Sequence, residues 1–282
     1  MTTMHVRNLV KDFTVRSGLR RGTLRAVDDV SFTLSAGRTL GLVGESGSGK
    51  STVARLIARL DRPTSGTISL SDDRPDRSYR DLVQMVFQDP FASLNPMHTV
   101  GHHLARPLLL HGQAQRGRDV QQKVAELLDR VSLRPAAEFA RRRPHELSGG
   151  QRQRVAIARA LAPGAEVVVA DEPVSMLDVS IRLGVLNLLS RLRTEENLAV
   201  LYITHDLATA RHFSDDIIVM YRGRVVERGP ADQVILTPRH PYTRLLAASV
   251  PDPDARGREL PAATEITGSS TRAYDHYAGA WQ

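Results

Sequence analysis

A glycine-rich segment, GESGSGKS at residues 44–51, has the residue types and spacing that hold phosphate groups. Glycines let the backbone curl so that successive N–H groups face phosphate oxygens, and a helix that begins there adds partial positive charge. Lys50 is expected to reach the β- and γ-phosphates of a nucleotide, and the Ser51 hydroxyl to bind Mg²⁺. An ordinary Gly/Ser turn is the alternative, but the position between an apolar strand and a helix favours a phosphate loop. The residues expected to surround the nucleotide are Gly44, Glu45, Ser46, Gly47, Ser48, Gly49, Lys50, Ser51 and Thr52.

Two acids end the apolar segment EVVVADEP at residues 166–173. Asp171 is expected to hold Mg²⁺ through water. Glu172 is expected to act as the general base for a water that attacks the γ-phosphate. Acids at strand ends also cap helices, so this interpretation depends on the phosphate loop in the same chain. Ligands of parallel sheets lie at the carboxyl ends of the strands, where both motifs are found.

Two more polar residues follow apolar segments in the same way. Gln88 ends VQMVFQ, and a neutral side chain there can contact the metal and the attacking water without adding charge. His205 ends LYITH and is expected to contact the γ-phosphate, with a capping or satisfied histidine as the alternative. The predicted catalytic residues are Glu172, His205 and Gln88. The predicted metal ligands are Ser51, Gln88 and Asp171.

A second glycine-rich helix start, LSGGQ at residues 147–151, resembles another phosphate-binding element. If it bound the nucleotide of its own chain, the helical region around it would have to fold across its own phosphate loop. A second copy placed head-to-tail satisfies it instead, so that the nucleotide becomes part of a dimer interface. A glycine-rich helix start without a ligand is the alternative. The residues expected to complete the site of a neighbouring chain are Ser148, Gly149, Gly150 and Gln151.

The elements that must position these residues alternate between strands and helices. Strands are expected in HVRNLVKDFTV, AVDDVSFTLSAG, TLGLVG, GTISL, LVQMVFQD, EVVVADEP, AVLYITHD and a hairpin over 216–229. Strand–helix–strand alternation predicts a mostly parallel sheet with helices on its faces. We expect a nucleotide-binding core at 1–90 and 163–230, which includes an antiparallel β subdomain, and a helical subdomain at 91–162. The polar, Pro- and Gly-bearing tail from about 251 is expected to be loosely held.

Composition narrows the class of protein. The chain has 282 residues, 41% hydrophobic and 24% charged, as in globular proteins. It has no apolar run of the roughly 20 residues that span a bilayer, and its start lacks the apolar region of a secretory signal. It contains no cysteine, which excludes disulfides and cysteine-ligated metals. The net charge of +7 comes mainly from scattered arginines, and no nucleic-acid recognition module accompanies it. We therefore expect no nucleic-acid partner.

The phosphate loop, LSGGQ, VVVADE and ITHD, in this order, resemble the ATPase subunits of ABC transporters over about residues 4–250. The resemblance implies an α/β P-loop (RecA-like) fold with an N-terminal antiparallel β subdomain and an inserted helical subdomain. It implies that the nucleotide is ATP, with Mg²⁺. It also implies that Phe13 stacks on adenine, that Gln88 links the site to a membrane partner, and that Asp178, in SMLD, lies at the dimer seam. Met176 stands where the family usually has Ala, with no loss of activity expected.

A narrower resemblance is to oligopeptide, dipeptide and nickel importer ATPases, through VFQDPFASLNP and HPYTRLLAASVPDP in particular. The segment between SGTISL and VQMVFQD is shorter than in such subunits. This resemblance implies a C-terminal extension and tail at 231–282. It also implies a second ATPase subunit (the same or a paralogous chain), two membrane permease subunits, a solute-binding protein reached indirectly, and a peripheral position on the cytoplasmic face of the membrane.

Three alternatives to peptide import stay open at the level of sequence. One is an importer ATPase for nickel or another small solute. Another is a soluble ABC ATPase that acts on ribosomes or nucleic acid, although such proteins generally carry two cassettes or a long coiled coil. The last is a paralogue recruited into a metabolic complex.

Overall fold

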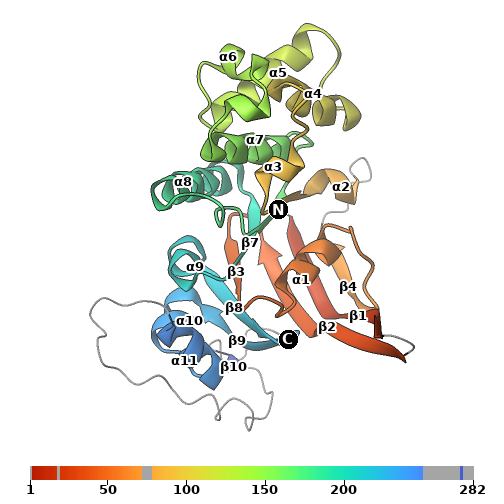
Figure 1. Ribbon diagram of the computed structural model, residues 1–282, viewed down its shortest axis with the longest axis vertical. Coiled ribbons are helices and arrows are strands. Elements are labelled where there is room, and N and C mark those ends of the chain that lie inside the picture. Colours follow the sequence, from red (N-terminus) through yellow and green to blue (C-terminus); the bar gives the residue numbers. More distant parts are fainter. Residues whose placement is uncertain (1, 18–19, 72–77, 250–273, 276–282) are drawn as a thin grey trace. The chain divides into compact units, whose positions relative to one another are not determined.

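The computed structural model describes residues 2–17, 20–71, 78–249 and 274–275, which fall into two compact units. The first unit is formed by residues 3–71 and 201–282, and the second by residues 72–200. Figure 1 shows the helices and strands, coloured along the sequence from red at the N-terminus to blue at the C-terminus. No helix within the described ranges is both long and apolar enough to cross a bilayer.

An antiparallel sheet in the first unit has the strand order β2–β1–β4, with β1 at Thr3–Ser17, β2 at Arg20–Ser35 and β4 at Ser65–Leu70. It confirms the predicted antiparallel β subdomain. Alternate apolar residues face the core, as in the buried cross-strand pair of Met4 and Leu34.

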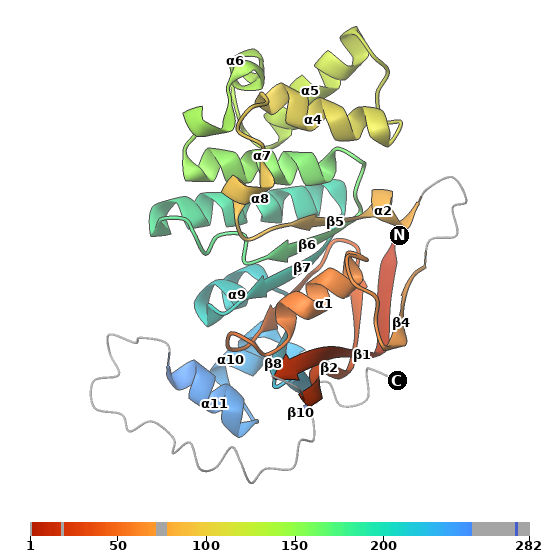
Figure 2. The same cartoon turned by 45° about the vertical axis from the view of Figure 1, so that its right-hand side comes forward.

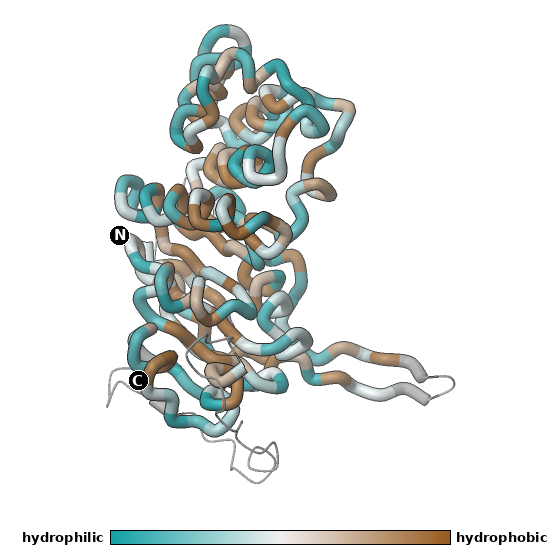
Figure 3. Tube along the Cα trace, turned by 60° about the vertical axis from the view of Figure 1, so that its left-hand side comes forward, coloured by the Kyte–Doolittle hydropathy of each residue, from teal (hydrophilic) through white to brown (hydrophobic). Residues whose placement is uncertain are grey.

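The strands β1 and β2 continue beyond the part that β4 covers. β4 pairs with β1 only as far as Val10, whereas the pairing of β1 with β2 continues to Ser17. The two strands therefore extend as a two-stranded ribbon, visible in Figure 3 as the long arm. Phe13 lies on this ribbon, paired with Leu24.

The first unit also contains strands of the mixed sheet in the order β10–β9–β8–β3–β7. β3 pairs in parallel with β8, and β8 and β9 form the predicted hairpin, which turns at Arg222 and Gly223, both with positive φ. The strands are β3 (Thr39–Val43), β7 (Ala199–Thr204, entered from the second unit), β8 (Asp216–Tyr221), β9 (Arg224–Pro230) and β10 (Tyr274–Asp275). The helices are α1 (Lys50–Ile57), α9 (Leu207–Phe213), α10 (Ala231–Leu236) and α11 (Pro241–Ala248).

One hydrophobic cluster ties the C-terminal helices of this unit to its strands. Val43 at the end of β3, Val219 of β8, Val234 of α10 and Tyr242 of α11 are all buried in it. The C-terminal helices thus share a core with the strand that leads into the phosphate loop.

The second unit contains the parallel strands β5 and β6, and Figure 2 shows α4, α5 and α8 beside α7. α4, α5 and α6 pack together, and α7 contacts α4 and α5 as well as α8. The strands are β5 (Val83–Val86) and β6 (Val167–Asp171). The helices are α2 (Tyr79–Leu82), α3 (Pro90–Ser93), α4 (Val100–Leu110), α5 (Arg118–Arg130), α6 (Ala136–Arg141), the 3₁₀ turn η1 (Pro144–Glu146), α7 (Gly149–Leu161) and α8 (Val179–Glu196).

The strands expected from the sequence are present, and the helices expected to begin at the phosphate loop and at LSGGQ are α1 and α7. The short helices α2, α3, α6, α9, α10 and α11 were not predicted. The division into a core and a helical subdomain at 91–162 stays a prediction. The shortened loop lies outside the described residues over 72–77. The tail from 251 also lies outside them, except for β10, which pairs in parallel with β9.

Candidate functional site

The predicted phosphate loop joins β3, which is buried along its whole length, to the start of α1. Two of its glycines occupy positions that other residues do not fit. Gly44 has a φ of 149° and Gly49 a φ of 103°. A Cβ would lie 2.3 Å from the Met220 carbonyl oxygen at the first position and 2.2 Å from that of Ala26 at the second. The loop therefore lies against neighbouring backbone on both sides, which only glycine permits there.

Lys50 begins α1 and is only 5% exposed. Its Nζ donates hydrogen bonds to the carbonyl oxygens of Gly44 and Glu45, both at 2.8 Å, and to the Ser48 hydroxyl at 3.4 Å. A buried ammonium group needs such acceptors, because burying an unpaired charge is costly. The lysine thus holds the first residues of the loop against the start of the helix. Ser51 follows it on α1 and is exposed.

The two predicted acids lie at the carboxyl end of β6 in the second unit. Asp171 is the last residue of the strand and is 9% exposed, and Glu172 follows it with a φ of 45°. The left-handed backbone at Glu172 is uncommon for a residue other than glycine and turns the chain sharply after the strand. The Gln88 side-chain amide donates a hydrogen bond from Nε2 to Glu172 Oε2 at 2.9 Å, so the structure brings these two predicted residues together.

His205 follows β7 in the first unit and is exposed. His205 does not cap α9, because Asp206 is the N-cap of that helix. The Asp206 carboxylate accepts hydrogen bonds from the backbone N–H groups of Ala208 and Thr209. β7 lies next to β3 in the sheet, so His205 and the phosphate loop follow neighbouring strands.

The LSGGQ segment begins α7 with a reciprocal cap. The Ser148 hydroxyl accepts from the backbone N–H of Gln151, and Gln151 Oε1 accepts from the backbone N–H of Ser148. This capping box satisfies two donors at the helix start. α7 has 13 residues, so its N-terminus also carries the partial positive charge that favours an anion.

The two glycines of this segment pack against the chain that enters α8. A Cβ at Gly149 would lie 3.2 Å from Leu177 Cδ2, and one at Gly150 would lie 2.4 Å from Ile181 Cγ2. The second distance is too short for a real contact. Arg182 holds the same connection, because its Nε donates to the Leu177 carbonyl oxygen at 2.8 Å. Gly150 is therefore needed for packing as well as for any contact with phosphate.

Replacing Gly150 with alanine should destabilise the protein in the absence of nucleotide. Overpacking against Ile181 costs about 1–3 kcal/mol, and the better helix propensity of alanine returns up to about 1 kcal/mol. The free energy of unfolding, measured in urea, should therefore fall by roughly 1 kcal/mol. In an Ile181→Ala background, the same substitution should become stabilising, as a double-mutant cycle detects.

Gly149→Ala is the matched control, because the atom that faces Gly149 is the end of the flexible Leu177 side chain. This substitution should leave the free energy of unfolding nearly unchanged. Equal stability losses from the two glycine substitutions would contradict the packing argument.

The remaining predicted residues are also placed. Asp178 is the N-cap residue of α8, and its exposed side chain makes no capping hydrogen bond. Phe13 is half-buried on the β1–β2 ribbon, and Lys11 Nζ lies 4.9 Å from its ring centroid. Sequence reasoning missed Arg182, which holds the connection between β6 and α8. A single long side chain of this kind leaves no periodic signal.

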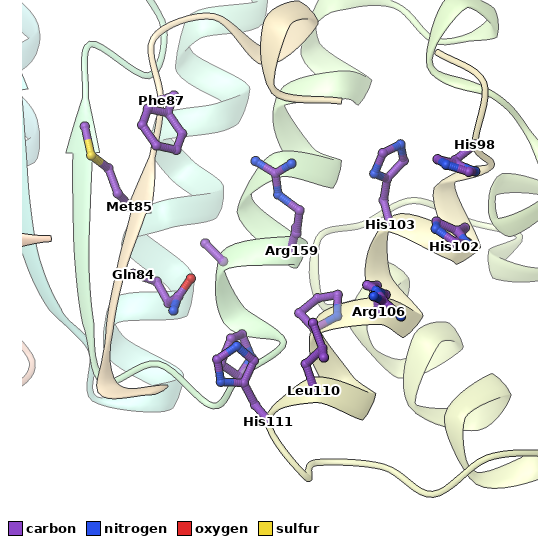
Figure 4. A pocket seen from close by; sticks show the side chains of 13 residues that line it. Gln84, Met85, Phe87, His98, His102, His103, Arg106, Leu110, His111 and Arg159 are labelled. Atoms are coloured by element: carbon purple, nitrogen blue, oxygen red, sulfur yellow. The ribbon is translucent and has the colours of Figure 1, made fainter. Parts of the chain in front are cut away.

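A groove of about 340 Å³ lies between β5, α4 and α7 in the second unit, and Phe87, the residue before Gln88, is one of those that line it. Figure 4 shows the β5 side chains on one side, those of α4 on the other, and Arg159 of α7 between them. The groove is lined by Gln84, Met85, Phe87, His98, His102, His103, Arg106, Pro107, Leu110, His111, Arg159, Ala160 and Pro163.

Basic groups dominate the polar side of this groove. The rings of His98 and His102 stack with centroids 4.1 Å apart, and His103 meets both edge-on. The pKa of His103 lies below its usual value, first because of burial and then because of the charge of Arg159 and its histidine neighbours. This histidine is therefore neutral near pH 7.

The segment PFASLNPMHTV, which leads from Gln88 towards the groove, divides its apolar residues between core and surface. Leu94 and Val100 are buried, whereas Phe91 and Met97 are 53% and 72% exposed. The Phe91 ring lies under the guanidinium group of Arg152, at 4.0 Å from its centroid.

Two family models match the chain. One, described as ABC transporter, matches residues 27–175, and the other, described as oligopeptide/dipeptide transporter, C-terminal region, matches residues 226–277. The first match covers the phosphate loop, LSGGQ and the two acids.

Relatives and solved structures agree with these matches. The oligopeptide transport ATP-binding protein AppF of Bacillus subtilis (strain 168) is 48% identical over 267 residues, which are 91% of this chain and 80% of AppF. The di/tripeptide transport ATP-binding protein DppF of Pseudomonas aeruginosa (strain UCBPP-PA14) is 46% identical over 260 residues, 89% of this chain and 79% of DppF. A dimeric ATP-binding cassette in a post-hydrolysis state, bound to ADP and Pi, has a TM-score of 0.68 and 32% identity over 81% of this chain and 98% of that chain.

Proposed function

The chain belongs to the ATPases of the ABC transporter family, in the branch with the oligopeptide/dipeptide transporter C-terminal region, and we therefore propose that it powers the import of peptides by binding and hydrolysing ATP. The observation that carries this proposal is the loop at 44–51, which closes on the start of α1 through buried Lys50. The relatives named for oligopeptides and for di- and tripeptides support peptides as the solute.

Each predicted residue has a distinct task in this proposal. Lys50 and the loop N–H groups bind the β- and γ-phosphates, and Phe13 stacks on the adenine ring. Glu172 accepts a proton from the attacking water, and Gln88 orients its carboxylate. His205 contacts the γ-phosphate.

Mg²⁺ fits the donors that this chain offers. The Ser51 hydroxyl, the Gln88 amide oxygen and the Asp171 carboxylate are hard oxygen ligands of the kind that Mg²⁺ takes, together with waters and substrate phosphates. When bound, the ion would neutralise part of the charge on the triphosphate.

We infer that two ATPase subunits, of this chain or of a paralogue, close head-to-tail on ATP. Ser148, Gly149, Gly150 and Gln151 of one subunit then face the γ-phosphate bound to the other. Two features support this arrangement: the dimeric state of the structural neighbour, and the position of the LSGGQ segment at the N-terminus of a long helix. Asp178 follows the connection that packs on Gly149 and is expected at the same seam.

The groove beside Gln88 is the proposed docking surface for a membrane permease subunit. Arg106 and Arg159 supply its positive charge, and no Asp or Glu is found among the described residues that line it. Of its four histidines, His103 is neutral and His111 pairs with the Asp81 carboxylate beside the groove. Its exposed apolar residues are Phe87 and Leu110. Charge complementarity therefore favours a permease segment that presents a carboxylate beside an apolar side chain. Two permease subunits, with a solute-binding protein beyond them, would place the chain at the cytoplasmic face of the membrane.

Uptake by cells tests the proposal. Cells that lack this chain should lose the uptake of labelled di-, tri- or oligopeptides, and the wild-type chain should restore it. Lys50→Ala should fail to restore uptake, because the loop loses its phosphate ligand. Unchanged peptide uptake together with lost Ni²⁺ uptake would favour a nickel importer, and unchanged uptake of every solute would favour the soluble alternatives.

The same assay tests the groove through two exposed leucines. Leu110 lies in the groove and is 67% exposed, whereas Leu236 lies on α10 and is 58% exposed. Leu110→Asp should abolish uptake because it puts an acid where the partner's acid is expected, and the purified variant should keep its basal ATPase activity. Leu236→Asp should keep both peptide uptake and basal ATPase activity. Equal uptake by the two variants would place docking elsewhere.

A further inference from the structure

The C-terminal HPY segment, His240–Tyr242, reaches the phosphate loop in the first unit. The Tyr242 hydroxyl accepts a hydrogen bond from the backbone N–H of Glu45 at 2.9 Å, across 197 residues of sequence. Glu45 is the second residue of the loop, and its carbonyl oxygen accepts from Lys50 Nζ at 2.8 Å. Both peptide groups of this residue are therefore held, one by the C-terminal helix α11 and the other by the phosphate-binding lysine.

Tyr242 is placed by packing as well as by this bond. Its side chain is 3% exposed within the cluster shared by β3, β8 and α10, and its ring lies 4.3 Å from that of Tyr221. Burial raises the pKa of Tyr242 to about 12. The phenol is therefore neutral at physiological pH, and its oxygen accepts the Glu45 N–H in that form.

A buried carboxylate anchors the segment that carries this tyrosine. Glu227 of β9 is fully buried, and its two oxygens accept from the backbone N–H groups of Arg239 at 2.8 Å and His240 at 3.0 Å. His240 Nδ1 then accepts from the backbone N–H of Tyr242 at 3.1 Å and caps α11. Burial lowers the pKa of His240, which favours the neutral ring that this bond requires. The start of α11 is thus fixed to the sheet, and with it the position of the phenol.

We propose that Tyr242 is a positioning residue of the ATP site: it holds the phosphate loop in its binding conformation through the Glu45 N–H without touching the nucleotide. The inference rests on the proposed nucleotide site at residues 44–52. Without the phenol, part of the free protein adopts other loop conformations, and the apparent dissociation constant becomes the intrinsic constant divided by the fraction that keeps the binding conformation.

Tyr242→Phe tests this with almost no change in packing. The dissociation constant for MgATP of the full chain should rise about 3- to 10-fold, as expected for one neutral hydrogen bond. The Glu45 amide should also exchange its hydrogen faster in the free protein. Glu227→Gln loosens the start of α11 instead. It should also raise the dissociation constant for MgATP and speed hydrogen exchange at the Glu45 amide. If Tyr242→Phe does not fold, this second variant tests the proposal.

Tyr202→Phe is the matched control. Tyr202 is also buried, and its hydroxyl donates to Thr209 Oγ1 of α9 at 3.2 Å. This variant should lose thermal stability but bind MgATP within about twofold of the wild type. Lower stability with an unchanged MgATP affinity in Tyr242→Phe would overturn the inference, because it would make the tyrosine merely structural.

Lys50→Ala separates this inference from the proposed site. If Lys50→Ala binds MgATP as tightly as the wild type, the nucleotide site itself is wrong. If Lys50→Ala loses binding while Tyr242→Phe retains wild-type affinity, the site stands and only the positioning by Tyr242 fails.

Discussion

Glu172→Gln should bind MgATP nearly as tightly as the wild type while its turnover falls about 10²- to 10⁴-fold, the usual contribution of a general base. The amide cannot accept the proton of the attacking water. It has the same size as the acid, and its oxygen can still accept from Gln88 Nε2, so the turn after β6 is expected to persist. The ATP-bound variant should also accumulate as a dimer. Steady-state hydrolysis, nucleotide binding and light scattering measure these three effects.

Glu195→Gln, on the exposed face of α8, is the control for removing one negative charge from the same unit. Its turnover should stay within about twofold of the wild type. Hydrolysis by Glu172→Gln at the wild-type rate would show that another group accepts the proton.

Ser148→Arg should leave ATP binding to the variant's own loop intact and should lower dimer-dependent hydrolysis by at least about 10²-fold, as when a preorganised anion contact is removed. The arginine puts bulk at the helix start that is proposed to face the neighbouring nucleotide. It also removes the α7 cap, which by itself costs about 0.5–2 kcal/mol of stability. Thr99→Arg is matched for this second effect, because Thr99 caps α4 through the same kind of hydroxyl contact. Thr99→Arg should keep hydrolysis.

Mixing two inactive variants distinguishes a site completed by a neighbour from one completed within the same chain. Ser148→Arg keeps a working phosphate loop, and Lys50→Ala keeps a working LSGGQ segment. A mixed dimer therefore contains one site with both elements intact, and hydrolysis should rise well above that of either variant alone. Absence of any recovery, with mixed dimers shown to form, would mean that each chain completes its own site.

The sequence predicted the elements that carry the motifs because the signals there are local. The apolar runs that lead to Gly44 and Glu172 are strands, and the helix start expected at LSGGQ is the beginning of α7. α9, α10 and α11 were missed since each has only six to eight residues, too few for a clear period.

Local sequence patterns do not predict contacts between segments that are far apart in the chain. The packing of Gly150 on Ile181 depends on how α7 meets α8, so the glycines were interpreted only as phosphate ligands. In the sequence, the HPY segment indicates only the narrower resemblance. Its contact with Glu45 depends on how α11 packs on the sheet, which no local pattern encodes.

The distance in sequence between Glu45 and Tyr242 has a consequence for biosynthesis. At about 5–20 residues per second, a ribosome adds the tyrosine roughly 10–40 s after the glutamate. During that interval the nascent chain already carries Lys50 but lacks the phenol that accepts the Glu45 N–H. A product released early, before α11 is made, would therefore retain every hallmark motif of the family and still lack one of the bonds that shape its nucleotide loop.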